Sequence, residues 1–399
     1  MNLKNIVIVN DFNYIQGGAS KVALNTAKLL KNYGYNVYFF SAVFKEDEVI
    51  EGINYITSNQ KECLKDSNKI RGMLNGLYNK KAKKCFQELL DKLDKNETII
   101  HIHGWTKALS SSVFDIAYKK RFKIVLTLHD YFSACPNGGY FNFRTNKICT
   151  LKGNSIKCVC KNCDSRNYLF KIYRVARMFV QNKIVGFNKK LNYAIGISDL
   201  NIKVLKDNFK NCKIYKVNNP IDINKTMIID SRENNDYYLY VGRITKEKGV
   251  EKFCEIVTKA NLKGLVVGDG SEKEVLESRY QNIKFVGWKS EEAVKKYISG
   301  SRGLIFPSLW YEGAPLTPLE FMSVGLPCAI SNLCAGKEYI QNNNGVLIDP
   351  YNIEDSVKQV KILDENRIEM GNRAFEYYKE FTKKNYVDEL INVYKEMSE

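Results

Sequence analysis

Short apolar runs alternate with amphipathic stretches along the chain, and this pattern occurs twice. Residues 5–10 (NIVIVN) form an apolar run typical of a parallel strand that is covered on both faces. Gly17 and Gly18 then precede an expected helix over 19–33, which has apolar residues at helical spacing and stops at Gly34. Further strands are expected at 36–42, 98–103, 123–128 and 193–197. The alternation predicts a doubly wound parallel sheet.

The same pattern restarts in the second half of the chain. Strands are expected there at 237–241, 264–267, 282–286, 303–306 and 327–331. A boundary near Pro220 predicts an α/β fold of two Rossmann-like domains, over 1–218 and 219–372. Residues 373–399 are expected to form C-terminal helices, with a return to the first domain as a hypothesis.

Length and composition fit two folded domains. The 399 residues are 44% hydrophobic, enough for two cores. We find no run of about 18 apolar residues that would span a membrane, and the lysine-containing start, Met1–Val9, has the pattern of a strand. We therefore expect a soluble, cytoplasmic and unprocessed protein.

The net charge of +17 is unevenly distributed. Residues 1–220 hold 37 Lys and Arg against 16 Asp and Glu, whereas the remaining residues hold 24 against 28. Such asymmetry indicates that the first domain faces an anionic partner: nucleic acid, a phosphorylated acceptor or an anionic membrane leaflet. A general bias toward lysine in the coding sequence is the alternative interpretation.

Two cations follow the first strand of the second half. After Tyr240 and Val241 come Gly242 and Arg243, and Lys248 follows in the run KEKG. Open α/β sheets bind ligands at the carboxyl ends of their strands. Arg through its forked donors and Lys as a point charge can hold a diphosphate, although basic surface turns are common.

A longer motif, PSLWYEGAPLTPLE, begins at Pro307 after the strand at 303–306. Glu312 and Glu320 are separated by seven residues in it. A helix is expected to begin near Thr317, because proline is tolerated in a first turn. Its backbone N–H groups, around Thr317 and Leu319, would meet a phosphate, and the Glu320 carboxylate can accept both hydroxyls of a ribose.

The run 240–249 together with the Glu312/Glu320 pair resembles the nucleotide-sugar site of glycosyltransferase family 4. The resemblance implies the GT-B fold, in which two Rossmann-like, doubly wound domains face each other across a cleft. The resemblance implies that Arg243 and Lys248 hold the donor diphosphate, Glu320 the ribose and Glu312 the transferred sugar. It extends to Gly268 in the turn VGDG and to Trp288 after FVG, which borders the base. Trp288 packing on that base and Trp288 as an ordinary surface aromatic are both open.

In the first domain, Gly17 and Gly18 match the family's glycine loop at the diphosphate, although an ordinary tight turn has the same residues. His129 matches the family's histidine at the sugar-binding edge, where it would contact the donor sugar; a role as general base is less secure. His101 and His103 are expected to be sheet residues with satisfied hydrogen bonds.

The resemblance implies a retaining transferase. Arg243, Lys248 and a helix N-terminus would stabilise the departing nucleoside diphosphate without a divalent metal, and the leaving phosphate would accept the acceptor's proton. The chain has no DxD motif, which disfavours metal-dependent GT-A chemistry. The donor is expected to be a UDP- or GDP-sugar.

Five cysteines lie within 29 positions: Cys135, Cys149, Cys158, Cys160 and Cys163. Reduced thiols at such spacing suit a structural zinc ion held by four of the five better than disulfides. Free thiols are the equal alternative, and an iron–sulfur cluster is a further one. The cysteine-rich insertion, about 135–164, would fold over the acceptor side of the cleft.

The stretch Tyr168 to Leu191 mixes Lys and Arg with large apolar residues at helical spacing. It suits a helix at a membrane interface, and equally a helix whose apolar face packs in its own domain. With the basic first half, it favours brief docking on the inner face of the cell membrane. The acceptor would then be a saccharide or a lipid-pyrophosphate-linked saccharide of capsule, O-antigen or exopolysaccharide synthesis.

Two other classes of function stay open. An epimerase or a non-catalytic nucleotide-sugar-binding protein would share the fold. A nucleic-acid-binding protein would explain a pI near 9.2, but the second half is acidic and contains no recognised binding module.

Overall fold

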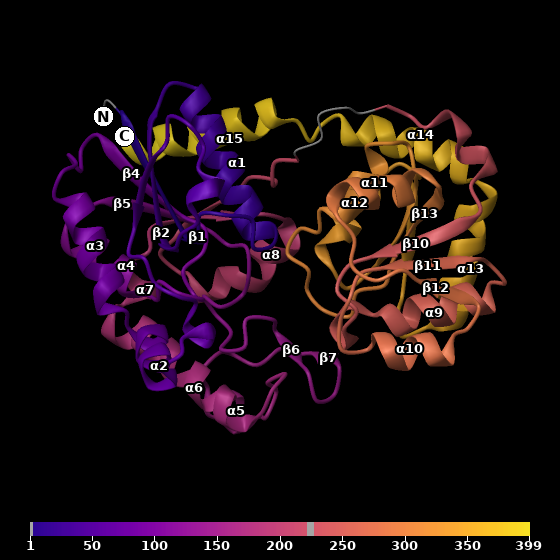
Figure 1. Ribbon diagram of the computed structural model, residues 1–399, viewed down its shortest axis with the longest axis horizontal. Coiled ribbons are helices and arrows are strands. Elements are labelled where there is room, and N and C mark those ends of the chain that lie inside the picture. Colours follow the sequence, from indigo (N-terminus) through magenta and orange to yellow (C-terminus); the bar gives the residue numbers. More distant parts are fainter. Residues whose placement is uncertain (1–2, 222–226) are drawn as a thin grey trace. The chain divides into compact units, whose positions relative to one another are not determined.

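The computed structural model describes residues 3–221 and 227–399, which form two α/β units (Figure 1). The first comprises residues 1–139, 151–220 and 383–399, and the second comprises 140–150 and 221–382. The division falls at Pro220, two residues after the expected end of the first domain. Only the last helix, α15 (Lys383–Ser398), returns to the first unit, while α14 (Arg367–Tyr378) stays with the second.

The first unit is built on a seven-stranded sheet in the order β3-β2-β1-β4-β5-β8-β9. Every pairing is parallel. Its strands are β1 (Asn5–Phe12), β2 (Asn36–Val43), β3 (Asn54–Thr57), β4 (Thr98–Ile102), β5 (Lys123–Thr127), β8 (Tyr193–Gly196) and β9 (Lys213–Lys216). The expected strands at 5–10, 36–42, 98–103, 123–128 and 193–197 are confirmed to within two residues; β3 and β9 were not predicted.

The helices of this unit are α1 (Gly18–Asn32), α2 (Lys69–Leu77), α3 (Lys80–Leu90), α4 (Ser112–Lys119), α5 (Ile156–Cys160), α6 (Tyr168–Phe179), α7 (Phe187–Lys190) and α8 (Asp199–Leu205), together with α15. Apolar residues of α1 and α15 share one core with β1, as the adjacent indigo and yellow helices of Figure 1 show. Within that core, the Thr26 and Tyr386 hydroxyls are hydrogen-bonded at 2.5 Å.

The second unit has a six-stranded sheet in the order β12-β11-β10-β13-β14-β15, again parallel throughout. Its strands are β10 (Tyr237–Val241), β11 (Gly264–Val267), β12 (Ile283–Phe285), β13 (Ser301–Phe306), β14 (Cys328–Ser331) and β15 (Gly345–Ile348). The strands expected at 237–241 and 264–267 are confirmed to the residue. A two-residue hairpin, β6 (Phe141–Asn142) with β7 (Lys147–Ile148), also groups with this unit.

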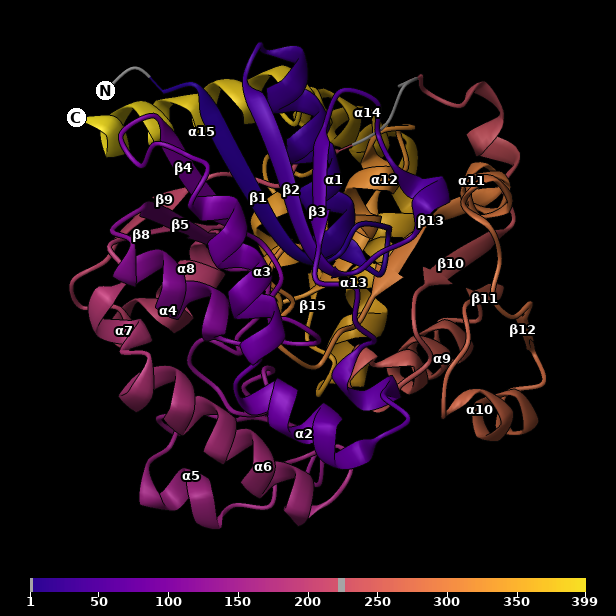
Figure 2. The ribbon, with the colours of Figure 1, turned by 60° about the vertical axis from the view of Figure 1, so that its left-hand side comes forward.

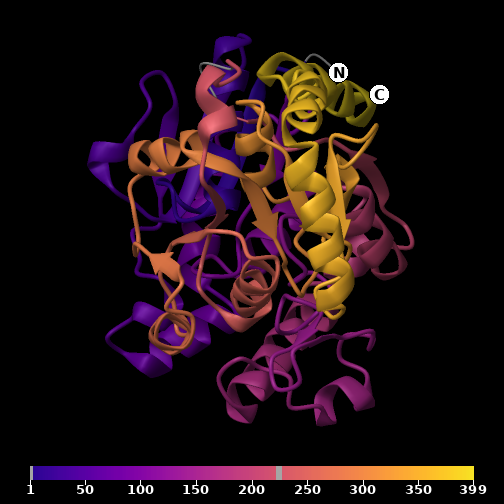
Figure 3. The same ribbon diagram turned by 90° about the vertical axis from the view of Figure 1, so that its right-hand side faces the viewer.

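Two cores lie on opposite faces of this sheet because side chains alternate along each strand. On β10, Tyr238 and Tyr240 join the core with α9 (Val250–Lys259) and α13 (Ile353–Glu365). Leu239 joins the other, with α11 (Glu291–Ser299), α12 (Thr317–Met322) and α14. Short helix α10 (Lys273–Arg279) completes the unit, whose gold C-terminal helices Figure 3 shows in front of the strands.

In both units the strand order reverses between two central neighbours, β1/β4 in the first and β10/β13 in the second. Doubly wound sheets bind ligands outside the carboxyl ends of the strands at such a point. The fold therefore predicts ligand binding at the loops after β1, β10 and β13, which contain most of the predicted site residues.

Candidate functional site

The loops after β10 and β13 meet at the carboxyl edge of the second unit. After β10, a short turn over Lys246–Lys248 ends at Gly249, whose φ of +70° is in the left-handed region. A Cβ at Gly249 would lie 2.0 Å from the carbonyl oxygen of Pro307, the first residue after β13. The Leu309 amide also donates to the Glu247 carbonyl at 2.9 Å. Only glycine permits this close approach of the two loops.

Within this edge, Lys248 and Glu312 form an ion pair. Their side chains are only 17% and 12% exposed. The Ser308 hydroxyl donates to the same Glu312 Oε1 at 3.0 Å, and the Lys248 ammonium lies 5.5 Å from the centre of the Trp310 ring. Burial alone would raise the pKa of Glu312, but the charge of Lys248 and the Ser308 hydrogen bond hold it below its ordinary value of 4.5.

Arg243 lies at the same edge but faces solvent. Its side chain is 63% exposed and approaches Glu247 at 3.6 Å. The Tyr240 hydroxyl donates to its carbonyl at 2.9 Å and so fixes the backbone directly after β10. The exposed Arg243 guanidinium and the nearly buried Lys248 ammonium together make this edge positively charged, and an anionic ligand can reach it.

The other predicted residues of the second unit lie in three settings. Glu320 is partly buried on α12, which begins at Thr317 as the proline pattern predicted. The side chain of Leu319 is 1% exposed and packs in a core, so only its backbone can face a ligand. Trp288 is 74% exposed after edge strand β12.

Backbone contacts bring the loops after β10, β11 and β12 together. Gly242 (φ +154°) donates its amide to Val267, and Gly268 (φ +146°) donates to Gly287, both at 3.0 Å. A Cβ at Gly268 would be 1.8 Å from the Gly242 carbonyl oxygen. Because these glycines carry no side chains, the three loops can approach one another closely next to Arg243.

In the first unit, Gly17 is the N-cap of α1 and Gly18 is the first residue of that helix. Gly17 has a φ of +103°, which favours glycine. A Cβ at either residue would meet no atom within 4 Å, so the backbone here faces open space. A ligand can therefore approach this loop closely.

The three histidines of the first unit are stacked in a row. His101 is completely buried, with its ring nitrogens 2.6 Å from the Tyr394 hydroxyl and 2.7 Å from the Thr127 hydroxyl. His103 Nδ1 lies 2.9 Å from His129 Nε2. The Nε2 of His103 is buried without a protein partner, so the expectation that both His101 and His103 are satisfied is wrong for His103.

Burial keeps these imidazoles neutral. It lowers the pKa of His101 and of His129 to about 3, from an ordinary 6.5. His129 is partly exposed at the carboxyl end of β5. A neutral imidazole there can exchange hydrogen bonds with a sugar hydroxyl.

The cysteines do not assemble as a metal site. Among residues 3–221 and 227–399, no three His, Cys, Asp or Glu side chains are placed to hold an ion. Instead the Lys171 ammonium lies 3.3 Å from Cys158 Sγ and 3.4 Å from Cys163 Sγ. Cys135, also buried, donates to Asn137 at 3.0 Å, Cys149 is partly buried, and Cys160 is exposed at the end of α5. Zinc held by four of the five cysteines stays a prediction, and Lys171 stands where it would compete with such an ion for Cys158 and Cys163.

Sequence reasoning missed the supports of the site. It quoted Ser308 without giving it a role, and it did not single out Gly249 or Trp310. Position was the available signal for Ser308, which is the second residue after β13 and lies four positions before Glu312. The contact of Gly249 with Pro307 joins residues 58 positions apart, which no local pattern indicates.

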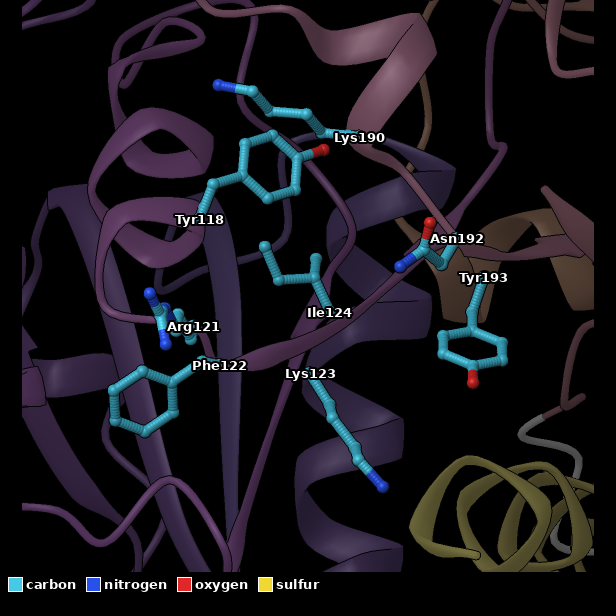
Figure 4. Close-up of a pocket in the computed structure, with 8 residues that line it drawn as sticks. All are labelled: Tyr118, Arg121, Phe122, Lys123, Ile124, Lys190, Asn192 and Tyr193. Atoms are coloured by element: carbon cyan, nitrogen blue, oxygen red, sulfur yellow. The ribbon is translucent and has the colours of Figure 1, made fainter. Parts of the chain in front are cut away.

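A separate hollow of about 470 Å³ lies at the amino-terminal edge of the first sheet, where β5 and β8 begin (Figure 4). Tyr118 and the cations Arg121, Lys123 and Lys190 line it. None of the predicted site residues does. Because ligands of such sheets bind at the opposite edge, this hollow is not the candidate site.

Comparison with known proteins gives partial matches in sequence. A family model described as "Glycosyl transferases group 1" matches residues 224–396. The UDP-Gal:alpha-D-GlcNAc-diphosphoundecaprenol alpha-1,3-galactosyltransferase of Escherichia coli is 30% identical over 157 residues, 35% of this chain and 40% of that protein. The chain spans less than half the length of this relative and of two further curated relatives.

Solved structures match along almost the whole chain. Sucrose-phosphate synthase from Thermosynechococcus elongatus has a TM-score of 0.72 at 14% identity, covering 99% of both chains. Anabaena Alr3699/HepE in complex with UDP has a TM-score of 0.65 at 14% identity, covering 99% of this chain and 100% of that one. The expected fold class is confirmed: the chain has the GT-B fold, with two Rossmann-like halves.

Proposed function

We propose that this protein is a retaining glycosyltransferase, similar to those of family 4, that uses a nucleotide-sugar donor. The observation that carries the proposal is the Lys248–Glu312 pair, held at the carboxyl edge of the β10/β13 switch point beside the exposed Arg243. Matches to transferase sequences over residues 224–396 support the same half of the chain as the donor site.

In this proposal, transfer requires stabilisation of the negative charge on the departing nucleoside diphosphate. Arg243 can bind two phosphate oxygens with its fork, and Lys248 adds a nearly buried point charge. Such preorganised cations stabilise a leaving group without a divalent metal. Glu320 would bind the ribose, with the backbone around Thr317 and Leu319 beside the phosphates and Trp288 at the base.

Glu312 has a double role in the proposal. Its carboxylate holds Lys248 in place, and its second oxygen can accept a hydroxyl of the transferred sugar. A carboxylate kept ionised near the anomeric carbon also stabilises the positive charge that develops there. Retention follows if the acceptor attacks from the leaving-group side, so that the departing phosphate takes the acceptor's proton.

From the first unit, we infer contributions of Gly17, Gly18 and His129. The open backbone at the glycine pair would approach the diphosphate. The neutral imidazole of His129, oriented by His103, would hold a hydroxyl of the donor sugar. His129 is thus a positioning group for the sugar.

The acceptor is proposed to be a lipid-linked saccharide of bacterial surface polysaccharide synthesis. The relative named above acts, by its name, on a diphosphoundecaprenol-linked sugar. The excess of Lys and Arg in residues 1–220 suits a pyrophosphate at an anionic membrane. No helix in the described part of the chain is long and apolar enough to cross a bilayer. The contact we propose is peripheral.

The test is a transfer assay with UDP- and GDP-sugars, a lipid-linked saccharide acceptor, and EDTA present. Wild type should form a glycosidic bond with the donor's anomeric configuration, read from the NMR coupling of the anomeric proton. Glu312→Gln should lower kcat about 10² to 10³-fold. Glu255→Gln is the matched control, because Glu255 also pairs with a lysine, Lys252, at 2.9 Å. Inverted product, or free sugar epimerised at a ring carbon, would overturn the proposal.

A further inference from the structure

Helix α2 has its large apolar side chains on the solvent side. Its buried residues are Gly72 and Gly76. A Cβ at Gly76 would lie 2.1 Å from the Tyr173 hydroxyl oxygen, so a larger residue does not fit. Ile70 and Leu74, one turn apart, are 72% and 60% exposed. The glycines let α2 pack closely, and that packing fixes the apolar face outward.

Helix α6 also exposes large apolar side chains, and it buries charged ones. It buries Lys171, Arg177 and Met178. Leu169 is 78% exposed, and Ile172 and Phe179 are exposed at helical spacing on the same helix. A globular helix normally buries its apolar stripe and exposes its charges. Sequence left two interpretations open for this segment, a helix at a membrane interface and a helix whose apolar face packs in its own domain. The exposed Leu169, Ile172 and Phe179 do not pack in their own domain.

The two helices form one surface. Tyr173 of α6 donates its hydroxyl to the Met73 carbonyl of α2 at 3.0 Å. Between the helices lies an apolar groove of about 270 Å³. It is lined by Cys63, Leu64, Met73, Leu169, Phe170 and Tyr173, among others. Figures 1 and 2 both show α2, α5 and α6 together at one end of the first unit.

Exposed apolar residues are concentrated here. Ten of the nineteen large apolar side chains exposed in the described residues lie on α2, α5, α6 and the short turns at Cys63–Lys65 and Val180–Ile184. Contiguous apolar patches of this kind mark protein or membrane contacts. We call this surface the α2–α6 face.

Charge distinguishes between the possible occupants. Residues 156–190 contain nine Lys and Arg and one acidic residue; six of the nine are exposed, whereas Lys171 and Arg177 are buried. Lys69 and Lys183 are exposed beside the apolar residues. A second copy would bring the same positive charge to the contact, whereas an anionic bilayer supplies the opposite charge and a hydrocarbon layer.

We propose that the α2–α6 face docks on an anionic lipid bilayer, with Leu74 and Leu169 entering the boundary between headgroups and acyl chains. The lysines and arginines around them contact the headgroups. The biological role rests on the transferase proposed above, whose lipid-linked acceptor would lie in that membrane. The docking itself needs no sugar transfer.

The test is co-sedimentation of the full chain with vesicles of phosphatidylglycerol and phosphatidylcholine, and with phosphatidylcholine alone. Wild type should bind the anionic vesicles and lose binding as salt rises. The double variant Leu74→Ser/Leu169→Ser should lower the partition coefficient at least about tenfold. Leu169→Trp should raise it, because tryptophan prefers the interface.

The matched control is Val275→Ser/Ile362→Ser, two similarly exposed apolar residues of the second unit, 52% and 43% exposed. It should bind like wild type. Equal binding by the serine double variant and wild type would overturn the proposal. The proposal would also be overturned if wild type fails to bind vesicles and instead forms a dimer, measured by light scattering, that the serine double variant does not form. Glu320→Ala should bind vesicles normally, so a failed donor site and a failed membrane surface give different results.

Discussion

The ammonium group of Lys248 donates a hydrogen bond to the carboxylate of Glu312, and a serine supports the contact. Ser308 Oγ donates to the same carboxylate oxygen at 3.0 Å. The two partners come from the loops after β10 and β13, the strands between which the sheet order reverses. A flexible lysine is thereby held at the edge where a phosphate would bind, before any ligand arrives.

Removing the cation from this pair should make stability depend on pH. In wild type the pKa of Glu312 is below 4.5, so its contribution to the free energy of unfolding is present above pH 4.5 and lost below it. In Lys248→Met, burial should raise that pKa above 4.5, so the variant is penalised increasingly as pH rises. We expect the free energy of unfolding of Lys248→Met, measured with urea, to be about 3 kcal/mol lower than that of wild type at pH 7.5. The difference should shrink toward pH 5.

The control for this pair is Lys252→Met. Lys252 and Glu255 pair at 2.9 Å on α9 and are about one quarter exposed, so their loss should change stability by less than about 1 kcal/mol at either pH. A deficit in Lys248→Met that does not vary with pH would contradict the role assigned to the buried carboxylate.

Replacing Gly249 should separate steric clash from backbone strain. Gly249→Ala adds a Cβ 2.0 Å from a carbonyl oxygen at φ +70°. Gly287→Ala has nearly the same φ, +72°, and meets only the Lys273 ammonium at 3.5 Å. We expect about 1–2 kcal/mol of destabilisation for Gly287→Ala and at least about 3 kcal/mol for Gly249→Ala. Equal losses in thermal unfolding would show that the two loops do not touch as described.

The buried histidines should make the first unit acid-sensitive. Burial lowers the pKa of His101 to about 3 from 6.5. The stability that this neutral ring contributes is complete above pH 6.5 and is lost as pH falls toward 3, because the unfolded chain binds the proton more readily. His101→Gln should reduce the slope of unfolding free energy between pH 6 and 5 by about 1.4 kcal/mol per pH unit. An unchanged slope, measured by denaturant titration at pH 7, 6 and 5, would contradict this origin.

Lys171 should protect two thiols. Its amine lies between Cys158 and Cys163, and all three side chains are buried. Lys171→Ala should open a cavity and increase the rate at which a disulfide reagent labels these thiols about tenfold or more. Lys152→Ala, at an exposed lysine, is the control and should leave that rate unchanged. We also expect EDTA to leave the melting temperature of wild type unchanged. If purified wild type contains stoichiometric zinc and Cys163→Ser does not, the metal site predicted from sequence is supported instead.

Strands and the switch-point loops were predictable because they are local patterns. An apolar run of four or five residues between polar turns identified β10 and β11 to the residue, and Pro318 indicated the start of α12. The family resemblance assigned Lys248 and Glu312 to one donor site but did not predict that the two side chains pair. Their contact depends on the order of β10 and β13 in the sheet.

The orientation of α6 was not predictable from its sequence. Lysines, arginines and apolar residues alternate there at helical spacing, and either set could face inward. The choice is made by distant partners: the thiols around Lys171 and the carbonyl of Thr106, which accepts from Arg177 at 3.3 Å. The contacts of the cysteine cluster were unpredictable for the same reason, since spacing alone does not show that a lysine stands between two sulfurs.

The most direct test of the donor site is calorimetric titration of the full chain with UDP, GDP and ADP in the presence of EDTA. One nucleotide should bind wild type, with affinity reduced at least about tenfold in Glu320→Ala and in Lys248→Met and unchanged in Lys252→Met. If no nucleotide binds a folded wild type, or if Glu320→Ala and Lys248→Met bind as wild type does, the second unit is not the nucleotide site.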